Sequence, residues 1–155
     1  MNYMVRALGI GFVAGLRSMT APAVVANAAH AGRLRLRSTP ARFMKSKRAA
    51  QVFSAFALME YVADLLPNTP SRTELPGLVT RAVTGGFAGY CVAVSERENA
   101  TAGVALGASA AIAGAFAGYY ARTGLTKCLS TPDYQVAIPE DMLAIGLGSF
   151  FAFRR

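Results

Sequence analysis

Residues 101–121 contain no charged side chain, and this run limits what the chain can fold into more than any other stretch. An α-helix crosses a bilayer core about 30 Å thick with about 20 apolar residues, so the run is long enough to span a membrane. Hydrophobic residues make up 54% of the chain and charged residues 15%, against about 25% charged residues in a soluble domain. The Ala/Gly runs lack the alternation of membrane β-strands. We therefore expect an all-α bundle of membrane helices, in a single domain over residues 1–155.

Five apolar segments can be drawn along the chain, and each is expected to form a helix of this bundle. They cover residues 3–28, 49–66, 76–94, 101–121 and 139–153. The last segment is short for a complete crossing and is expected to span only part of the bilayer. For the first segment a secretory signal peptide is the alternative, because an apolar run follows a basic start and leads into small residues.

The loop at residues 29–48 separates the first two apolar segments and is strongly basic. Seven of the sixteen basic residues lie between Arg33 and Arg48. Under the positive-inside rule such a loop is cytoplasmic, and its cations are expected to bind anionic lipid. With five crossings, the N-terminus would lie outside and the C-terminal end inside. The net charge of +8 does not predict nucleic-acid binding, because the basic cluster lies between membrane-like segments.

The stretch GLRSMTAP at residues 15–22 interrupts the first apolar segment with Arg17, the hydroxyls of Ser18 and Thr20, and a proline. We expect the first helix to be broken near Ser18–Pro22. Backbone groups freed by such a break are tolerated in a membrane only where protein or a water-filled cavity satisfies them. The N-terminus of the second half-helix would carry a partial positive charge, and beside Arg17 it would attract an anion.

Glu60 and Asp64 lie four residues apart in the second segment, on one face of the expected helix. Charges at membrane depth cost about 2.5–3.5 kcal/mol each on insertion scales, so these carboxylates are expected to meet cations. Arg17 and Arg81 are the natural partners. Two alternatives remain open: a purely structural ion-pair network that locks helices together, and an Arg81 that extends to the membrane interface.

Two short echoes within the sequence leave an internal repeat open. Residues 17–21 (RSMTA) resemble residues 81–85 (RAVTG), and GGFAGY at 85–90 resembles GAFAGY at 114–119. Repeats commonly frame the substrate site of a transporter, so Thr84 is a candidate site residue beside Arg81. The second echo relates adjacent helices and fits a division into two halves poorly.

Glycines recur four residues apart in the apolar segments, and each pair leaves two bare patches on one helix face where a neighbour can pack closely. Packing within the chain is the favoured interpretation, and homo-oligomer formation through one of these faces is the open alternative. The pairs are Gly11/Gly15, Gly85/Gly89, Gly103/Gly107 and Gly114/Gly118.

The remaining reactive or charged residues predict no cofactor and no metal. Cys91 and Cys128 have no CxxC or histidine-linked spacing, and His30 is the single histidine. Glu140 and Asp141 follow a proline at the expected start of the last helix, where they would complement the positive end of its dipole.

The stretches GLRSMTAP and EYVADLLPNTPSRTELPGLVTRAVTGGFAG (residues 60–89) resemble a bacterial family of small multispanning membrane proteins, the domain of unknown function DUF4126. The likeness covers most of the chain. It implies a multi-pass protein of the bacterial cytoplasmic (inner) membrane, and it implies no activity. Its most specific marks are Gly15-Leu16-Arg17 in the first segment, Glu60, Asp64 and Pro67 in the second, and Arg81 with Gly85 in the third.

From these features we expect a small transporter or channel component for a small polar or anionic solute, with Glu60 or Asp64 carrying a coupling proton. A hydrated pocket at these charges would support this function, and a dry, fully paired cluster would count against it. A non-catalytic subunit of a membrane complex is the alternative; an enzyme acting on lipid-linked substrates is disfavoured, because DDxxD, HExxH, GxSxG and P-loop patterns are absent. The candidate solute- or ion-binding residues are Arg17, Ser18, Thr20, Glu60, Asp64, Arg81 and Thr84.

Overall fold

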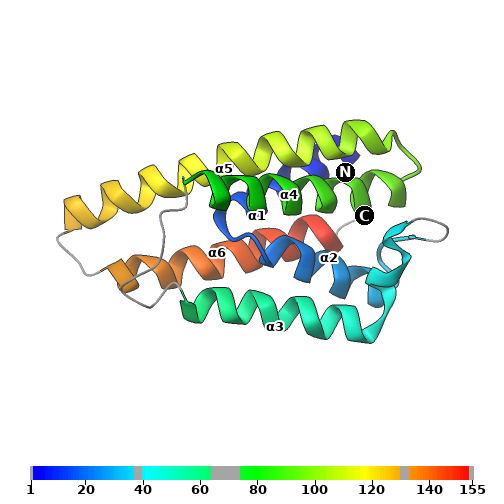
Figure 1. Cartoon of the computed structure of the whole chain (residues 1–155), viewed down its shortest axis with the longest axis horizontal. Coiled ribbons are helices and arrows are strands. Elements are labelled where there is room, and N and C mark those ends of the chain that lie inside the picture. Colours follow the sequence, from blue (N-terminus) through cyan, green and yellow to red (C-terminus); the bar gives the residue numbers. More distant parts are fainter. Residues whose placement is uncertain (1, 37–39, 64–73, 130–132, 154–155) are drawn as a thin grey trace.

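A computed structural model describes residues 2–36, 40–63, 74–129 and 133–153, and within these ranges it contains helices and no strands. The helices α2 to α6 run roughly along the long axis of the molecule and form one bundle (Figure 1). The predicted all-α fold is therefore confirmed. The elements are α1 (Tyr3–Leu16), α2 (Thr20–His30), the 3-10 helix η1 (Pro40–Lys45), α3 (Lys47–Ala63), α4 (Leu75–Ser95), α5 (Ala100–Leu129) and α6 (Asp133–Phe153).

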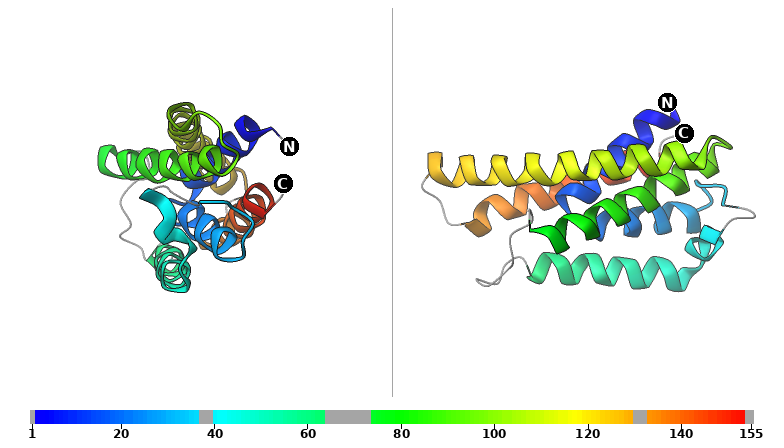
Figure 2. Two further views of the ribbon diagram at one scale, coloured as in Figure 1. Left: turned by 90° about the vertical axis from the view of Figure 1, so that its right-hand side faces the viewer. Right: turned by 45° about the horizontal axis from the view of Figure 1, so that its top comes forward.

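The first apolar segment folds back on itself instead of continuing across the bundle. α1 and α2 are joined by residues 17–19, so the chain breaks where the sequence predicts it. α2 then returns to the end of the bundle at which α1 begins (Figure 2). Two contacts place both ends there, because Arg6 pairs with Glu96 in the α4–α5 turn and the Arg35 N–H donates to Ser95 Oγ at 2.9 Å.

This reversal corrects the expected topology. The N-terminus was expected on the opposite side from the basic loop, and the structure places it on the same side. At about 1.5 Å per residue α1 is about 21 Å long and α2 about 17 Å, so neither covers a bilayer core of about 30 Å. We call α1, residues 17–19 and α2 the N-terminal hairpin, and residues 17–19 its tip.

The hairpin is fixed to α4 and α5 by glycine contacts that bring backbones together. A Cβ added at Gly11 would lie 2.3 Å from the Gly107 carbonyl oxygen, and one added at Gly85 would lie 2.7 Å from the same oxygen. A Cβ at Gly15 would lie 2.2 Å from the Ala111 oxygen. The predicted use of these glycines for packing within the chain is confirmed by these distances.

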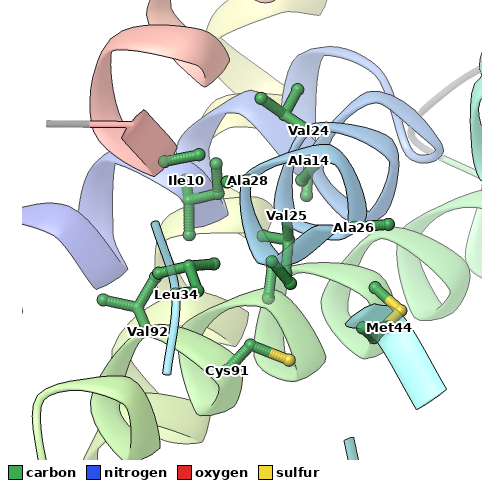
Figure 3. Packing of buried hydrophobic residues seen from close by; sticks show 14 of the residues in the cluster. Ile10, Ala14, Val24, Val25, Ala26, Ala28, Leu34, Met44, Cys91 and Val92 are labelled. Atoms are coloured by element: carbon green, nitrogen blue, oxygen red, sulfur yellow. The ribbon is translucent and has the colours of Figure 1, made fainter. Parts of the chain in front are cut away.

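An apolar core lies between the hairpin, α4 and the segment that follows α2 (Figure 3). Leu34, Leu36 and Met44 are buried in it, while the alternate residues Arg33 and Arg35 are exposed. The basic loop is thus attached to the bundle by its apolar residues and presents its cations outward. Residues 29–30 and 47–48 of the expected loop belong to α2 and α3.

Two of the expected helix bounds are wrong. α5 runs to Leu129 instead of 121, and α6 begins at Asp133 instead of 139, so the last helix is not a short, partial segment. Pro139 lies inside α6; the sequence suggested a helix start there because proline removes one backbone donor and favours first turns. Residues 64–66 of the expected second segment lie outside the described residues.

Within the described residues, two helices are both long enough and apolar enough to cross a membrane, Leu75–Ser95 and Ala100–Thr126, while the apolar helix Tyr3–Leu16 is shorter. Length and composition of two helices are weak support for a membrane protein, because the core helix of a soluble protein passes the same test. Five crossing segments are not confirmed.

The first sequence echo, between residues 17–21 and residues 81–85, has no matching similarity in backbone structure. Residues 17–21 cover the break between two helices, whereas residues 81–85 lie within the continuous helix α4. An Arg-x-x-Thr pattern therefore occurs in two different backbone conformations, and these elements give the internal repeat no structural support.

Candidate functional site

The tip of the N-terminal hairpin forms a polar cluster inside the bundle. Arg17 is 0% exposed, Ser18 9% and Thr20 2%. The end of α1 leaves carbonyls without helical partners, and the start of α2 leaves N–H groups without them. Side chains from α3 and α4 bind backbone groups beside these helix ends, and a side chain from α6 pairs with Arg17.

Glu60 of α3 binds the start of α2. Its Oε1 accepts from the Ser18 N–H at 2.9 Å and from Ser18 Oγ at 2.8 Å, and its Oε2 accepts from the Met19 N–H at 2.8 Å. The N-terminus of a helix favours a negative charge, because its free N–H groups and its dipole both point toward it. The anion position that the sequence suggested for a solute is thus occupied by a carboxylate of the chain itself.

Arg81 of α4 binds the end of α1. Its side chain is 7% exposed, its Nε donates to the Gly15 carbonyl at 3.0 Å, and its Nη1 donates to the Gly77 carbonyl at 3.3 Å. The C-terminus of a helix favours a positive charge. The two helix ends at the tip therefore each meet a side chain of opposite charge, from two different helices.

Arg17 occupies the break itself and reaches α6 and α3. Its backbone is extended, with φ −142° and ψ 111°, and its side chain forms an ion pair with Asp141 through Nη2 and Oδ1 at 2.5 Å. Its guanidinium carbon lies 5.5 Å from the centre of the Tyr61 ring, which is within cation–π range. The Tyr61 hydroxyl shares a hydrogen bond of 2.6 Å with Thr20 Oγ1.

Five of the predicted site residues are brought together at the tip, and one described residue is not. Thr84 Oγ1 donates to the Thr80 and Arg81 carbonyls one turn back in its own helix, at 3.0 and 3.2 Å. Asp64 lies outside the described residues. The five residues at the tip are Arg17, Ser18, Thr20, Glu60 and Arg81.

The predicted pairing of Glu60 differs from the observed one, and the predicted pairing of Asp64 lies outside the described residues. In the part of the chain that the structure describes, Glu60 forms no ion pair with Arg17 or Arg81 and instead binds the backbone at the start of α2. Asp141 is the partner that the sequence missed. It was assigned to a helix start, but it lies in the third turn of α6, so the dipole explanation is wrong.

Two further residues were not singled out from the sequence. Tyr61 follows Glu60 and carried no signal of its own. Arg6 is 1% exposed at the opposite end of α1, where it pairs with Glu96 and donates to the carbonyls of Phe151 at 3.0 Å and Ala152 at 3.2 Å. A lone arginine in an apolar segment was the available signal for Arg6.

The described residues of the site form no cluster that would hold a metal ion. Across the described ranges there is no group of three or more His, Cys, Asp or Glu side chains suited to a metal. The polar groups of the tip are helix-end amides, carboxylates, hydroxyls and guanidinium groups, which are suited to binding an anion or a small polar molecule.

Comparison with known proteins gives a family and no further relative. No curated protein and no solved structure matches the chain. A family model matches residues 4–154, nearly the whole chain and all of the helices that form the tip. On this match, and in agreement with the resemblance at the tip residues, the chain belongs to the family described as domain of unknown function DUF4126.

Proposed function

We propose that this protein is an integral membrane protein in which α3 to α6 cross the bilayer and the N-terminal hairpin enters it from one side. The distribution of side chains supports this placement. Met59 of α3 is 64% exposed, Val83 of α4 65% and Met142 of α6 71%, whereas Arg17 and Arg81 are buried. Soluble monomers seldom expose large contiguous apolar surfaces, and charged side chains at membrane depth face the bundle interior.

The basic loop sets the orientation in this proposal. Exposed cations at residues 33–48 lie at the end of the bundle that also holds the start of α1 and the α4–α5 turn. The positive-inside rule places this end in the cytoplasm, and a multi-pass protein of the bacterial inner membrane follows. Anionic lipid headgroups are the expected partners of the exposed arginines and lysines.

Within this frame we propose that the hairpin tip binds and moves a small polar or anionic solute together with a proton. One observation carries the proposal: the Glu60 carboxylate accepts three hydrogen bonds from Ser18 and Met19, immediately before α2, a half-helix whose N-terminus lies inside the bundle. A carboxylate in this position supports the proposal that the tip can hold an anion there. Glu60 and Asp141 are only partly buried, so the tip is paired but not sealed.

Protonation of Glu60 would allow a solute anion to take the place of the Glu60 carboxylate at the Ser18 and Met19 N–H groups. Protonation removes the negative charge from Glu60 and weakens its hydrogen bonds with the Ser18 and Met19 N–H groups, because charge-assisted hydrogen bonds are about twice as strong as neutral ones. A small anion can then accept from these donors. When Glu60 loses its proton, its carboxylate competes for the same donors and releases the anion, so that one proton and one anion move together.

A structural role for the tip is the second candidate, and the pairing of both helix ends favours it. Glu60 and Arg81 satisfy groups that the break would otherwise leave unpaired, and buried ion pairs can fix how helices pack without taking part in transport. The protein would then be a non-catalytic subunit of a membrane complex.

The experiment measures proton uptake by liposomes that contain the purified protein and an enclosed pH-sensitive dye, because one proton moving with one monovalent anion carries no net charge and gives no current. Chloride, nitrate, inorganic phosphate and glycolate are applied as concentration jumps at several pH values. We expect at least one anion to cause a protein-dependent acidification of the liposome interior that grows as the external pH falls. In Glu60→Gln, which cannot ionise, this growth with falling pH should disappear.

The matched control is Glu98→Gln, the same change in the exposed α4–α5 turn, and it should leave the pH profile unchanged. A wild-type protein that causes no acidification with any of the four anions would refute the transport proposal and favour the structural role. A pH profile that Glu60→Gln leaves intact would remove Glu60 from the coupling mechanism.

A further inference from the structure

A cavity of about 520 Å³ lies beside the hairpin tip. It is bounded by the end of α1, the second half of α5 and residues 139–143 in the middle of α6. This volume is within the range of about 300–1,000 Å³ that small-molecule sites have. Its walls are almost entirely apolar, with Phe12, Leu16, Leu125 and Leu143 among them. A small inorganic anion would gain little from such walls, so the occupant must have an apolar body.

The mouth of the cavity opens on the surface that the proposed bilayer covers. Leu125 on one rim is 46% exposed and Leu143 on the other is 53% exposed. If α5 and α6 cross the membrane, the Leu143 rim faces hydrocarbon, and the Leu125 rim lies about one turn of α5 beyond Arg122, towards the headgroups. An occupant would therefore enter sideways from the lipid phase.

Arg122 also lines the cavity and lies at the level of a lipid headgroup. It is about 33 Å along α5 from Ala100, at about 1.5 Å per residue. Ala100 follows the polar α4–α5 turn, so this distance places Arg122 just beyond a hydrocarbon core of about 30 Å. A guanidinium at this depth complements a phosphate.

We infer that this cavity binds one acyl chain of an anionic phospholipid from the leaflet opposite the basic loop, with Arg122 at its phosphate. The inference rests on the membrane placement proposed above. Glu140 lines the same cavity and carries the opposite charge, so it lowers the preference for an anionic headgroup that Arg122 creates.

This lipid would be in a position to influence the tip. The cavity wall includes Leu16 and Glu140, which are adjacent in sequence to the ion-paired residues Arg17 and Asp141. An acyl chain in the cavity would exclude water from one side of that ion pair, and interactions between charges strengthen where water is excluded.

The test uses fluorescence quenching, and the absence of tryptophan from the sequence makes every introduced tryptophan a single reporter. Phe12→Trp places the reporter in the cavity wall, and Val83→Trp places a control on the exposed face of α4. Each variant is reconstituted in vesicles containing small fractions of phosphatidylglycerol or phosphatidylcholine with brominated acyl chains. Circular dichroism checks that each variant keeps the helical content of the wild type.

We expect Val83→Trp to be quenched equally by the two lipids, in proportion to their fraction. Phe12→Trp should be quenched more readily by the anionic lipid, by less than the roughly five-fold preference that one basic residue alone gives near a lipid surface, because Glu140 offsets part of it. In the Phe12→Trp background, Arg122→Gln should remove this preference, Glu140→Gln should increase it, and Ala121→Phe should lower quenching by both lipids by filling the cavity.

The two proposals fail in different ways in this experiment. Quenching of Val83→Trp without stronger anionic quenching of Phe12→Trp would overturn the lipid site and leave the membrane placement standing. No quenching of Val83→Trp by either lipid would overturn the membrane placement itself, and the lipid site with it.

Discussion

The contact between α1, α4 and α5 at Gly107 gives the sharpest prediction about stability. A Cβ at this position would lie 2.2 Å from the Gly85 carbonyl oxygen and 2.9 Å from the Gly85 carbonyl carbon. Favourable contacts between carbon and carbonyl oxygen lie at about 3.3–3.6 Å, so Gly107→Ala requires α4 and α5 to separate by about 1 Å. The obstacle is backbone, which cannot rotate away as a side chain can.

Two opposing terms set the magnitude for Gly107→Ala. Alanine is favoured over glycine inside a helix by about 0.8–1.0 kcal/mol, and overpacking in a tight core costs about 1–3 kcal/mol. Separation of the helices also weakens the contact that Gly11 makes with the same backbone, so we expect a net loss of about 2 kcal/mol in the free energy of unfolding. For a chain of this size that corresponds to a fall in Tm of about 4–8 °C.

Thermal unfolding of the purified protein, followed by circular dichroism, measures this effect. The matched control is Gly124→Ala in the same helix, because a Cβ there would meet no heavy atom within 4 Å. The control should raise Tm by about 2–4 °C through helix propensity alone. If Gly107→Ala raised Tm as much as Gly124→Ala, the argument that close backbone contact holds these helices together would be refuted.

Three further changes test other contacts by the same thermal assay. Arg81→Met should destabilise the fold by about 1.5–3 kcal/mol, because it leaves the Gly15 carbonyl without its charged donor. Arg81→Lys should recover part of this loss, and equal Tm values for the two variants would contradict a role for the charged donor. Arg6→Met should lower stability by about 1–3 kcal/mol through the carbonyls at the end of α6, and an unchanged Tm would show that this end of α6 needs no donor. Arg97→Gly should raise stability by about 1 kcal/mol, because residue 97 has φ 62° and glycine adopts this conformation without steric cost; a lower Tm would argue against strain there.

The sequence predicted those features that depend on the residue types at a few neighbouring positions. An arginine, two hydroxyl residues and a proline within an apolar run predicted a helix break within one or two residues of the observed one. Glu60 was recognised because a carboxylate in an apolar helix needs a partner. The glycine pairs predicted close packing because a missing Cβ has the same consequence in any helix.

The direction of the chain after the break could not be predicted from these signals. A broken helix that continues and one that returns have the same hydropathy, because hydropathy counts residues and ignores their direction. The choice depends on contacts between distant residues, such as Arg6 with Glu96 and Arg35 with Ser95. The partners at the tip were mistaken for the same reason: opposite charges suggested Arg17 with Glu60, while the competing partner of Glu60 was the backbone of a new helix start.

The unequal packing of the two halves of the hairpin has a mechanical consequence. α1 meets α5 backbone to backbone at Gly11 and Gly15, so it has no side chains there that could rearrange and let it slide. α2 is joined to α3 through side chains at Glu60 and Tyr61, which can change partners. Opening of the tip would therefore separate α3 from α2 at Glu60 and Tyr61, while α1 stays in contact with α5.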